Sequence, residues 1–229
     1  MLADKLRTAT IEGLTYVGGY AQYIGAVPGT TTFPLNSLTG GIDTAARAGD
    51  LVLLFQTRSA FNSTASPTVP AGYTTLSRSL VGGSDYRVGW MLVYKLLSAA
   101  DTSVDLANSS SYFSAALVQV WRGVDSATPA SSTSVASTIS SSRSDPPSVT
   151  PTVAGSIVSA FGGNAAGGTA DLIPPGSLSA GFTVGGTGTA VAAGYIPWIT
   201  GSVDPSPFGA INDITSYSAV GISVVINPA

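Results

Sequence analysis

The chain has 229 residues with no cysteine and no histidine, which excludes disulfides, thiolate chemistry, a Ser-His-Asp triad and histidine-dependent zinc sites. Only 9% of its residues are charged, against about 25% in an average protein, and the formal net charge is −3. The basic residues are scattered along the sequence, so no cluster would neutralise phosphates and we expect no nucleic-acid partner.

The acidic residues and the length of the apolar runs indicate the fold class and whether the chain inserts into a membrane. Glu12 is the only glutamate, and aspartate favours turns whereas glutamate favours helices, so the acidic residues indicate a loop-rich β protein. No apolar run approaches the roughly 18 residues of a membrane span, and the N-terminus lacks the apolar stretch of a secretory signal. We therefore expect a protein made in the cytoplasm that does not insert into a membrane.

The opening section is predicted to contain an arm followed by two β segments. Residues 1–13 carry charges throughout, and we expect an N-terminal arm or a short helix there. Residues 14–26 place tyrosines between glycines, which indicates one or two strands with a bend. A second β-prone run covers residues 30–38, where Pro34 restricts it to a sheet edge or a bulge.

The clearest strands follow in the middle of the chain. The turn pair Gly49-Asp50 starts an apolar run that ends at Phe55, and this run is too short for a buried helix, so it favours a buried strand. Residues 86–97 alternate with a period of two. The residues predicted to share the apolar face of this strand are Tyr86, Val88, Trp90, Leu92, Tyr94 and Leu96. Because the other face is also partly apolar, we expect a central strand of a packed sheet.

A serine- and threonine-rich region covers residues 126–148 and has two interpretations. Its low complexity is typical of a linker, which would split the chain near residues 126–150. Val135 and Ile139 keep enough β character for a solvent-exposed edge strand, which we prefer. On that interpretation, residues 14–229 form a single β-sandwich domain.

The second half of the chain echoes the first. Four landmarks recur at nearly one offset, with Gly49 and Gly155 separated by 106 positions, Gly72 and Gly176 by 104, Gly89 and Gly194 by 105, and Ser114 and Ser218 by 104. A final strand is expected from residue 214 to residue 226. The sequence thus predicts an all-β fold, a jelly-roll-like antiparallel β-sandwich of ten or more short strands with two pseudo-equivalent halves. Chance similarity between strands is the alternative to a repeat.

Paired carboxylates are the one catalytic device that this composition leaves open. Asp101 and Asp105 form one close pair, and Asp204 and Asp213 flank a proline-rich loop. Aspartate in turns usually caps its own backbone, so we expect no catalysis, no cofactor and no metal site, calcium included. The glycine pairs at 162–163, 167–168 and 185–186 lack the following helix and the lysine of a phosphate loop, and we interpret them as turns.

Aromatic residues near the end of the second half are the candidate contact site. Trp198 and Tyr195 lie in one short segment, followed by a loop that contains Phe208. An aromatic side chain on an exposed loop can stack on a sugar or anchor a subunit contact. Ordinary core packing is the alternative for all three residues.

Several turn-and-strand segments between about residues 30 and 160 form a recognisable set: Leu38-Thr39-Gly40-Gly41, Ala48-Gly49-Asp50-Leu51-Val52, Pro70-Ala71-Gly72-Tyr73, Gly89-Trp90, Ala115-Ala116-Leu117 and Arg122-Gly123-Val124-Asp125. Together they resemble a group of bacteriophage virion proteins with jelly-roll-like modules. The resemblance implies a non-enzymatic role in a tail, a fibre or a capsid surface, and it carries over no active site.

Three functions follow as hypotheses. The first is a virion structural subunit, such as a tail or capsid-decoration protein, that is assembled in the host cytoplasm as a homo-oligomer with other virion proteins and contributes to host attachment. The second is a carbohydrate-binding module or adhesin that uses Trp198 to hold a host-surface glycan. The third is a polysaccharide depolymerase that uses an aspartate pair. We prefer the first.

Overall fold

The computed structural model describes residues 13–61, 66–82, 86–99, 101–139, 143–209 and 218–229. Within these residues the chain forms eleven β-strands and no helix. The strands are β1 Thr15–Gly25, β2 Gly29–Pro34, β3 Leu51–Phe61, β4 Thr74–Val81, β5 Tyr86–Leu96, β6 Ser103–Asn108, β7 Phe113–Arg122, β8 Ala130–Ile139, β9 Ile157–Thr169, β10 Ser179–Pro197 and β11 Ser218–Ile226.

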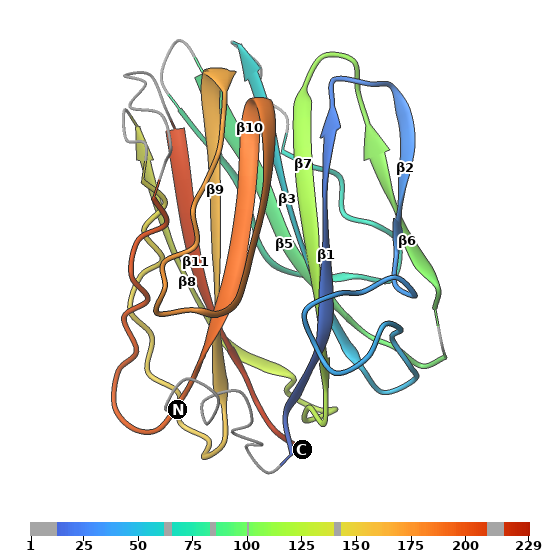
Figure 1. Ribbon diagram of the computed structural model, residues 1–229, viewed down its shortest axis with the longest axis vertical. Helices are drawn as coiled ribbons and strands as arrows, with labels where there is room; N and C mark the ends of the chain where they lie inside the picture. Colours follow the sequence, from blue (N-terminus) through green and yellow to red (C-terminus); the bar gives the residue numbers. More distant parts are fainter. Residues whose placement is uncertain (1–12, 62–65, 83–85, 100, 140–142, 210–217) are drawn as a thin grey trace, which may run out of the picture.

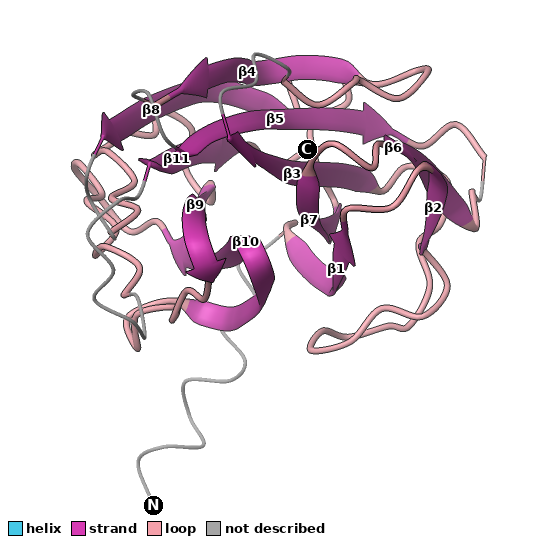
Figure 2. Cartoon of the chain, turned by 90° about the horizontal axis from the view of Figure 1, so that it is seen from above, coloured by secondary structure: helices cyan, strands magenta, loops and turns pink. Residues whose placement is uncertain are grey.

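Two antiparallel sheets pack face to face. The first sheet has the order β1-β7-β3-β5-β4, and the second sheet has the order β10-β9-β11-β8. The two sheets stand beside each other in Figure 1, and Figure 2 shows that the edge strands β4 and β8 lie close together on one side while β1 and β10 meet on the other. The predicted all-β antiparallel sandwich is confirmed, whereas its assignment to a jelly roll stays a prediction.

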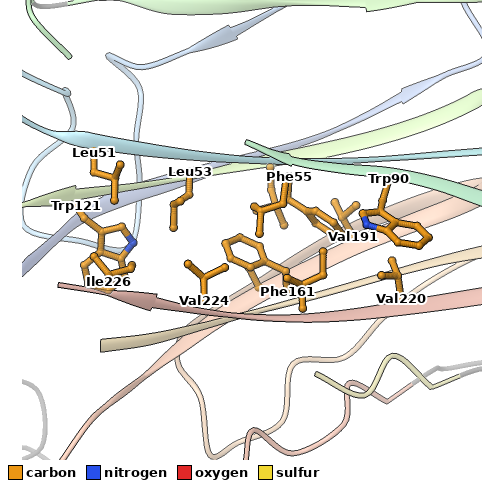
Figure 3. Packing of buried hydrophobic residues seen from close by; sticks show 14 of the residues in the cluster. Leu51, Leu53, Phe55, Trp90, Trp121, Phe161, Val191, Val220, Val224 and Ile226 are labelled. Carbon is orange, nitrogen blue, oxygen red and sulfur yellow. The ribbon is translucent and has the colours of Figure 1, made fainter. Parts of the chain in front are cut away.

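One hydrophobic core fills the space between the two sheets (Figure 3). Alternate residues of the central strands point into it, because successive side chains of a strand face opposite ways. The rings of Phe55 from β3 and Phe161 from β9 meet in this core with their centroids 5.5 Å apart. The apolar face predicted for residues 86–97 is confirmed, since Val88, Trp90 and Leu92 are all buried in the same core.

A third layer covers the outer face of the first sheet. β2 and β6 pair with each other as a small separate sheet, and Pro34 ends β2, in agreement with its predicted place at a sheet edge. Phe33 of β2 and Leu106 of β6 are fully buried against the outward-facing apolar residues of β3, β5 and β7. The first sheet is therefore buried on both faces, which explains why its strands are apolar on both sides.

The two sheets repeat one arrangement of strands. β3 lies between β7 and β5, and β9 lies between β11 and β10. β7 is flanked by β1, and β11 is flanked by β8. In the ladders, Leu51 pairs with Trp121 and Ile157 pairs with Ile226, so β3 and β9 are offset by 106 positions and β7 and β11 by 105. The predicted equivalence of the two halves thus holds for these strands.

The predicted offset between the aromatic strands of the two halves needs a correction. Phe55 pairs with Leu92, and the equivalent Phe161 pairs with Ala193, which gives an offset of 101 positions between β5 and β10. The predicted offset of 105 is therefore wrong by four positions for this strand. β10 differs because it doubles back on itself: Thr183 Oγ1 donates to the carbonyl oxygen of Val191 at 3.1 Å (Figure 1).

The interpretation of the glycine pairs as turns is also wrong. Residues 162–163 and 167–168 lie inside β9, and residues 185–186 lie inside β10. Neighbouring side chains explain these glycines, because a Cβ on Gly162 would lie 2.6 Å from Phe208 Cδ2 and one on Gly163 would lie 2.4 Å from Thr57 Cγ2. The glycines of β9 admit neighbouring groups to the strand backbone and do not reverse the chain. Gly185 and Gly186 belong to the part of β10 that doubles back.

The serine- and threonine-rich region contains a strand. Residues 130–139 of this region form β8 at the edge of the second sheet, as the edge-strand interpretation predicts. The predicted arm at residues 1–13 lies outside the described residues, except for Gly13. So does the part of the final predicted strand that precedes residue 218.

Candidate functional site

β8 is an edge strand of the second sheet. It pairs with β11 along one side from Ala130 to Ile139, and no other strand of the described residues pairs with its second side. The strand contains no charged residue, no proline and no glycine, and Val135 is 41% exposed. An edge of this kind offers unpaired N–H and C=O groups to another chain.

Three of the other edge strands have features that oppose pairing with another chain. β4 presents the exposed Arg78. β2 ends at Pro34, which has no N–H to donate. β10 packs against β1 and β7 of the first sheet, so the body of the protein covers it. Natural sheets block edge pairing with charges, prolines or cover. β8 has neither a charge nor a proline, which distinguishes it from β4 and β2, and its neighbour in the first sheet is β4.

Trp198 lies at one end of the sandwich, immediately after β10. Its side chain is partly buried, and its indole Nε1 donates to the carbonyl oxygen of Gly201 at 2.8 Å. The next residue, Ile199, is 90% exposed. The backbone N–H of Trp198 donates to the carbonyl oxygen of Ser156, and the N–H of Ser156 donates to the carbonyl oxygen of Val153. The exposed side chain of Val153 therefore also lies at this end.

Tyr195 belongs to an aromatic group inside the core. Its ring centroid lies 4.9 Å from Trp121 and 5.4 Å from Tyr16. Burial raises the pKa of Tyr195 above its ordinary value, and burial together with the nearby Tyr195 does the same for Tyr16. Tyr195 therefore contributes mainly to core packing, with an edge that reaches the surface.

Phe208 is fully buried on the opposite face of the second sheet. It belongs to a separate cluster of small apolar residues that includes Ala160, Ala192 and Leu172. Its backbone N–H donates to the carbonyl oxygen of Ser144 at 2.9 Å. The structure therefore does not bring Tyr195 and Phe208 together in one site, and the predicted contact stays open chiefly for Trp198.

Two of the segments that carry the bacteriophage resemblance meet in space. Asp50 is 1% exposed, and its two carboxylate oxygens each accept a hydrogen bond of 2.9 Å from Arg122. The hydrogen bonds to Asp50 raise the pKa of the Arg122 guanidinium. Farther along, Asp125 accepts from the N–H of Ala127 and from Thr128 Oγ1, which closes the turn after β7. These residues hold strand ends together, as turn-and-strand signatures do.

Two of the four aspartates considered for catalysis have structural partners. Asp101 forms an ion pair with Lys95. Asp105 accepts a hydrogen bond of 2.7 Å from Thr32 Oγ1 across the β2–β6 ladder. Asp213 lies outside the described residues. In the part of the chain that the structure describes, no three acidic side chains come close enough together to hold a metal ion.

Comparison with known proteins yields no relative. No family model, no curated protein and no solved structure matches the chain. Among the described residues, no helix has the length and apolarity needed to cross a membrane. The functional argument therefore starts from the geometry of this chain.

Proposed function

We propose that the protein is a non-enzymatic structural subunit of a bacteriophage virion, in a tail, a fibre or a capsid surface, and that identical copies assemble through β8. Two observations support the proposal. The first is the set of turn-and-strand segments that resemble virion proteins. The second, which carries the assembly step, is the uncharged and unpaired edge of β8.

The chemistry of β8 favours a second copy of the same strand as its partner. Two copies of one strand that meet antiparallel about a two-fold axis present the same surface to each other, which is the commonest symmetry of protein oligomers. Because β8 carries no charge, this contact brings no like charges together. Pairing would join the two four-stranded sheets into one continuous sheet through backbone hydrogen bonds.

Static light scattering behind gel filtration tests this assembly. We expect the wild-type mass to be a multiple of 22.9 kDa that rises with concentration. The variant Val135→Lys puts a positive charge on each copy of β8, and we expect it to lower the mass toward that of the monomer, because like charges at an interface repel. Val153→Lys is the matched control, since Val153 is also 41% exposed but lies outside the strands.

The outcomes distinguish self-assembly through β8 from self-assembly through another surface. An assembly that persists in Val135→Lys and dissociates in Val153→Lys would move the interface to the Trp198 end. A wild-type protein that stays monomeric at every concentration would contradict self-assembly through β8. Circular dichroism of both variants must show the β-sheet spectrum of the wild type.

A carbohydrate-binding module is the second candidate, supported by the partly exposed ring of Trp198 beside the 90% exposed Ile199. This function requires glycan binding that disappears in Trp198→Ala while the fold is retained. Equal glycan retention by wild type and Trp198→Ala would remove Trp198 from this argument.

A further inference from the structure

A polar group of side chains lies between the first sheet and the small β2–β6 sheet. Gln56 and Arg58 are two residues apart on β3 and therefore share its outer face. Ser114 of β7 pairs directly with Arg58 in the ladder. Asn108 at the end of β6 continues the inward face of that strand, and the backbone carbonyl of Ala107 accepts a hydrogen bond from Arg58 Nη2. These residues are called the Arg58 cluster below.

The Arg58 cluster is buried, and much of its hydrogen-bonding capacity has no protein partner. Gln56 and Ser114 are fully buried and Arg58 is 6% exposed. Both amide atoms of Gln56, the hydroxyl of Ser114, Nε of Arg58 and Oδ1 of Asn108 have no hydrogen-bond partner among the described residues. Buried polar atoms are almost always paired with protein, water or a bound group, so this concentration points to a bound species.

The charge of the cluster is positive. The ion pairs of the described residues include no carboxylate at Arg58. Burial lowers the pKa of the Arg58 guanidinium, and the charge of the nearby Arg78 lowers it further, while Tyr112 acts in the opposite direction. An arginine remains protonated in proteins all the same. A buried cation without a counter-ion is costly, and an anion bound beside it removes that cost.

We propose that the Arg58 cluster is a binding site for a small carboxylate anion, held by Arg58 Nε, Gln56 Nε2 and Ser114 Oγ. This site goes beyond the proposed assembly function and does not depend on it. The planar guanidinium and the amide donate in directions that suit the two oxygens of a carboxylate, and charge-assisted hydrogen bonds of this kind are the strong ones. Gln56 Oε1 and Asn108 Oδ1 are acceptors, so they take hydrogen bonds from water that enters with the anion.

Arg78 adds a second positive charge on the same face of the first sheet. It is exposed on the edge strand β4 and pairs with Met91, which in turn pairs with Gln56. Met91 is fully buried between them. The field of both arginines favours a small anion at the cluster.

Thermal unfolding with sodium formate tests the site, with sodium chloride added to hold the ionic strength constant. We expect the wild-type Tm to rise with formate in a saturable way, by about 5–11 °C at a concentration of about a hundred times the dissociation constant. Arg58→Met removes the charged donor and should abolish the rise. Arg47→Met is the matched control and should keep it, because the Arg47 side chain is 65% exposed and pairs with Asp43.

Two further measurements keep the test decisive if Arg58→Met does not fold. Gln56→Leu replaces the unpartnered amide by an apolar group and should also abolish the formate-dependent rise. In the wild type, the side-chain amide signals of Gln56 should shift saturably on titration with formate. A wild-type Tm independent of formate, or an equal rise in Gln56→Leu or Arg58→Met, would overturn the proposal. An equal rise when chloride replaces formate would also overturn it.

Discussion

The buried contact between Gln119 of β7 and Ser159 of β9 gives the sharpest test of how the two sheets pack. Both side chains are fully buried between the sheets. Ser159 Oγ donates to Gln119 Oε1 and lies 3.5 Å from the carbonyl oxygen of Gly194, while Gln119 Nε2 has no partner among the described residues. Whichever way the amide is turned, only one of its polar atoms reaches Ser159.

The repeat shows that this polar contact is not needed for packing. By the offsets of the ladders, Gln119 corresponds to Val224 and Ser159 corresponds to Leu53. Leu53 and Val224 are both buried in the core, where Figure 3 shows them on facing strands. Of these two equivalent contacts between the sheets, one is therefore built from apolar side chains and the other from a partly satisfied polar pair.

A double-mutant cycle measures the cost of the polar pair. Ser159→Ala alone should lower the free energy of unfolding by about 1–3 kcal/mol, because both polar atoms of the Gln119 amide are then buried without a partner. Gln119→Met together with Ser159→Ala keeps nearly the same shape without polar atoms, and we expect a stability equal to the wild type or about 1–2 kcal/mol higher. For a chain of this length each kcal/mol corresponds to about 2–4 °C in Tm.

Urea unfolding followed by tryptophan fluorescence gives the four free energies of the cycle. The reasoning requires Ser159→Ala to be the least stable of the variants and the double variant to recover all of the loss. A double variant less stable than Ser159→Ala would refute it, because it would show that the polar pair contributes more than its unsatisfied atom costs.

Two more predictions concern pH and a glycine. Burial raises the pKa of Tyr16 and Tyr195 in the folded protein. Their contribution to stability is therefore complete below the pKa of unfolded tyrosine, near 10, and is lost as the pH rises above that value. Urea midpoints should fall between about pH 9 and pH 11, and a constant midpoint would contradict this. Gly163→Ala would place a Cβ 2.4 Å from Thr57 Cγ2 and should cost about 1–3 kcal/mol by urea unfolding, whereas Gly176→Ala, with no atom within 4 Å, should cost less than a quarter of that.

The length of an apolar run, the turn residues beside it and the period-two alternation were sufficient to predict the main strands. The run from Gly49 to Phe55 lies in β3, and residues 86–97 form β5 up to Leu96 with the predicted inward face. Hydrophobic side chains fix these strands, because burying one face leaves only one register that fits. The same argument holds for β11, where Val220, Ile222, Val224 and Ile226 all face the core.

The ends of the central strands could not be predicted from local sequence. β3 continues past Phe55 through Gln56, Thr57 and Arg58, whose side chains are polar yet buried by β2, β6 and the second sheet. β9 continues through glycines that local rules assign to turns. In both strands a neighbour distant in sequence decides the structure, and a local pattern carries no information about that neighbour.

The candidate sites also differ in whether the local sequence or residues distant in the chain determine them. The edge strand at Val135 followed from the β character of Val135 and Ile139, whereas the burial of Phe208 depends on a loop that folds back over Gly162. The Arg58 cluster was missed because its burial requires the third layer formed by β2 and β6. The signal of it in the sequence was an arginine three positions after the apolar run that ends at Phe55.

Mass spectrometry of purified bacteriophage particles tests the central proposal most directly. Particles would be isolated by density gradient from a lysate in which a phage that carries this gene has multiplied, and washed in high salt. The proposal predicts peptides of this chain in the washed particles, in a fixed ratio to the other particle proteins. A chain that is abundant in the lysate and absent from the washed particles would contradict it.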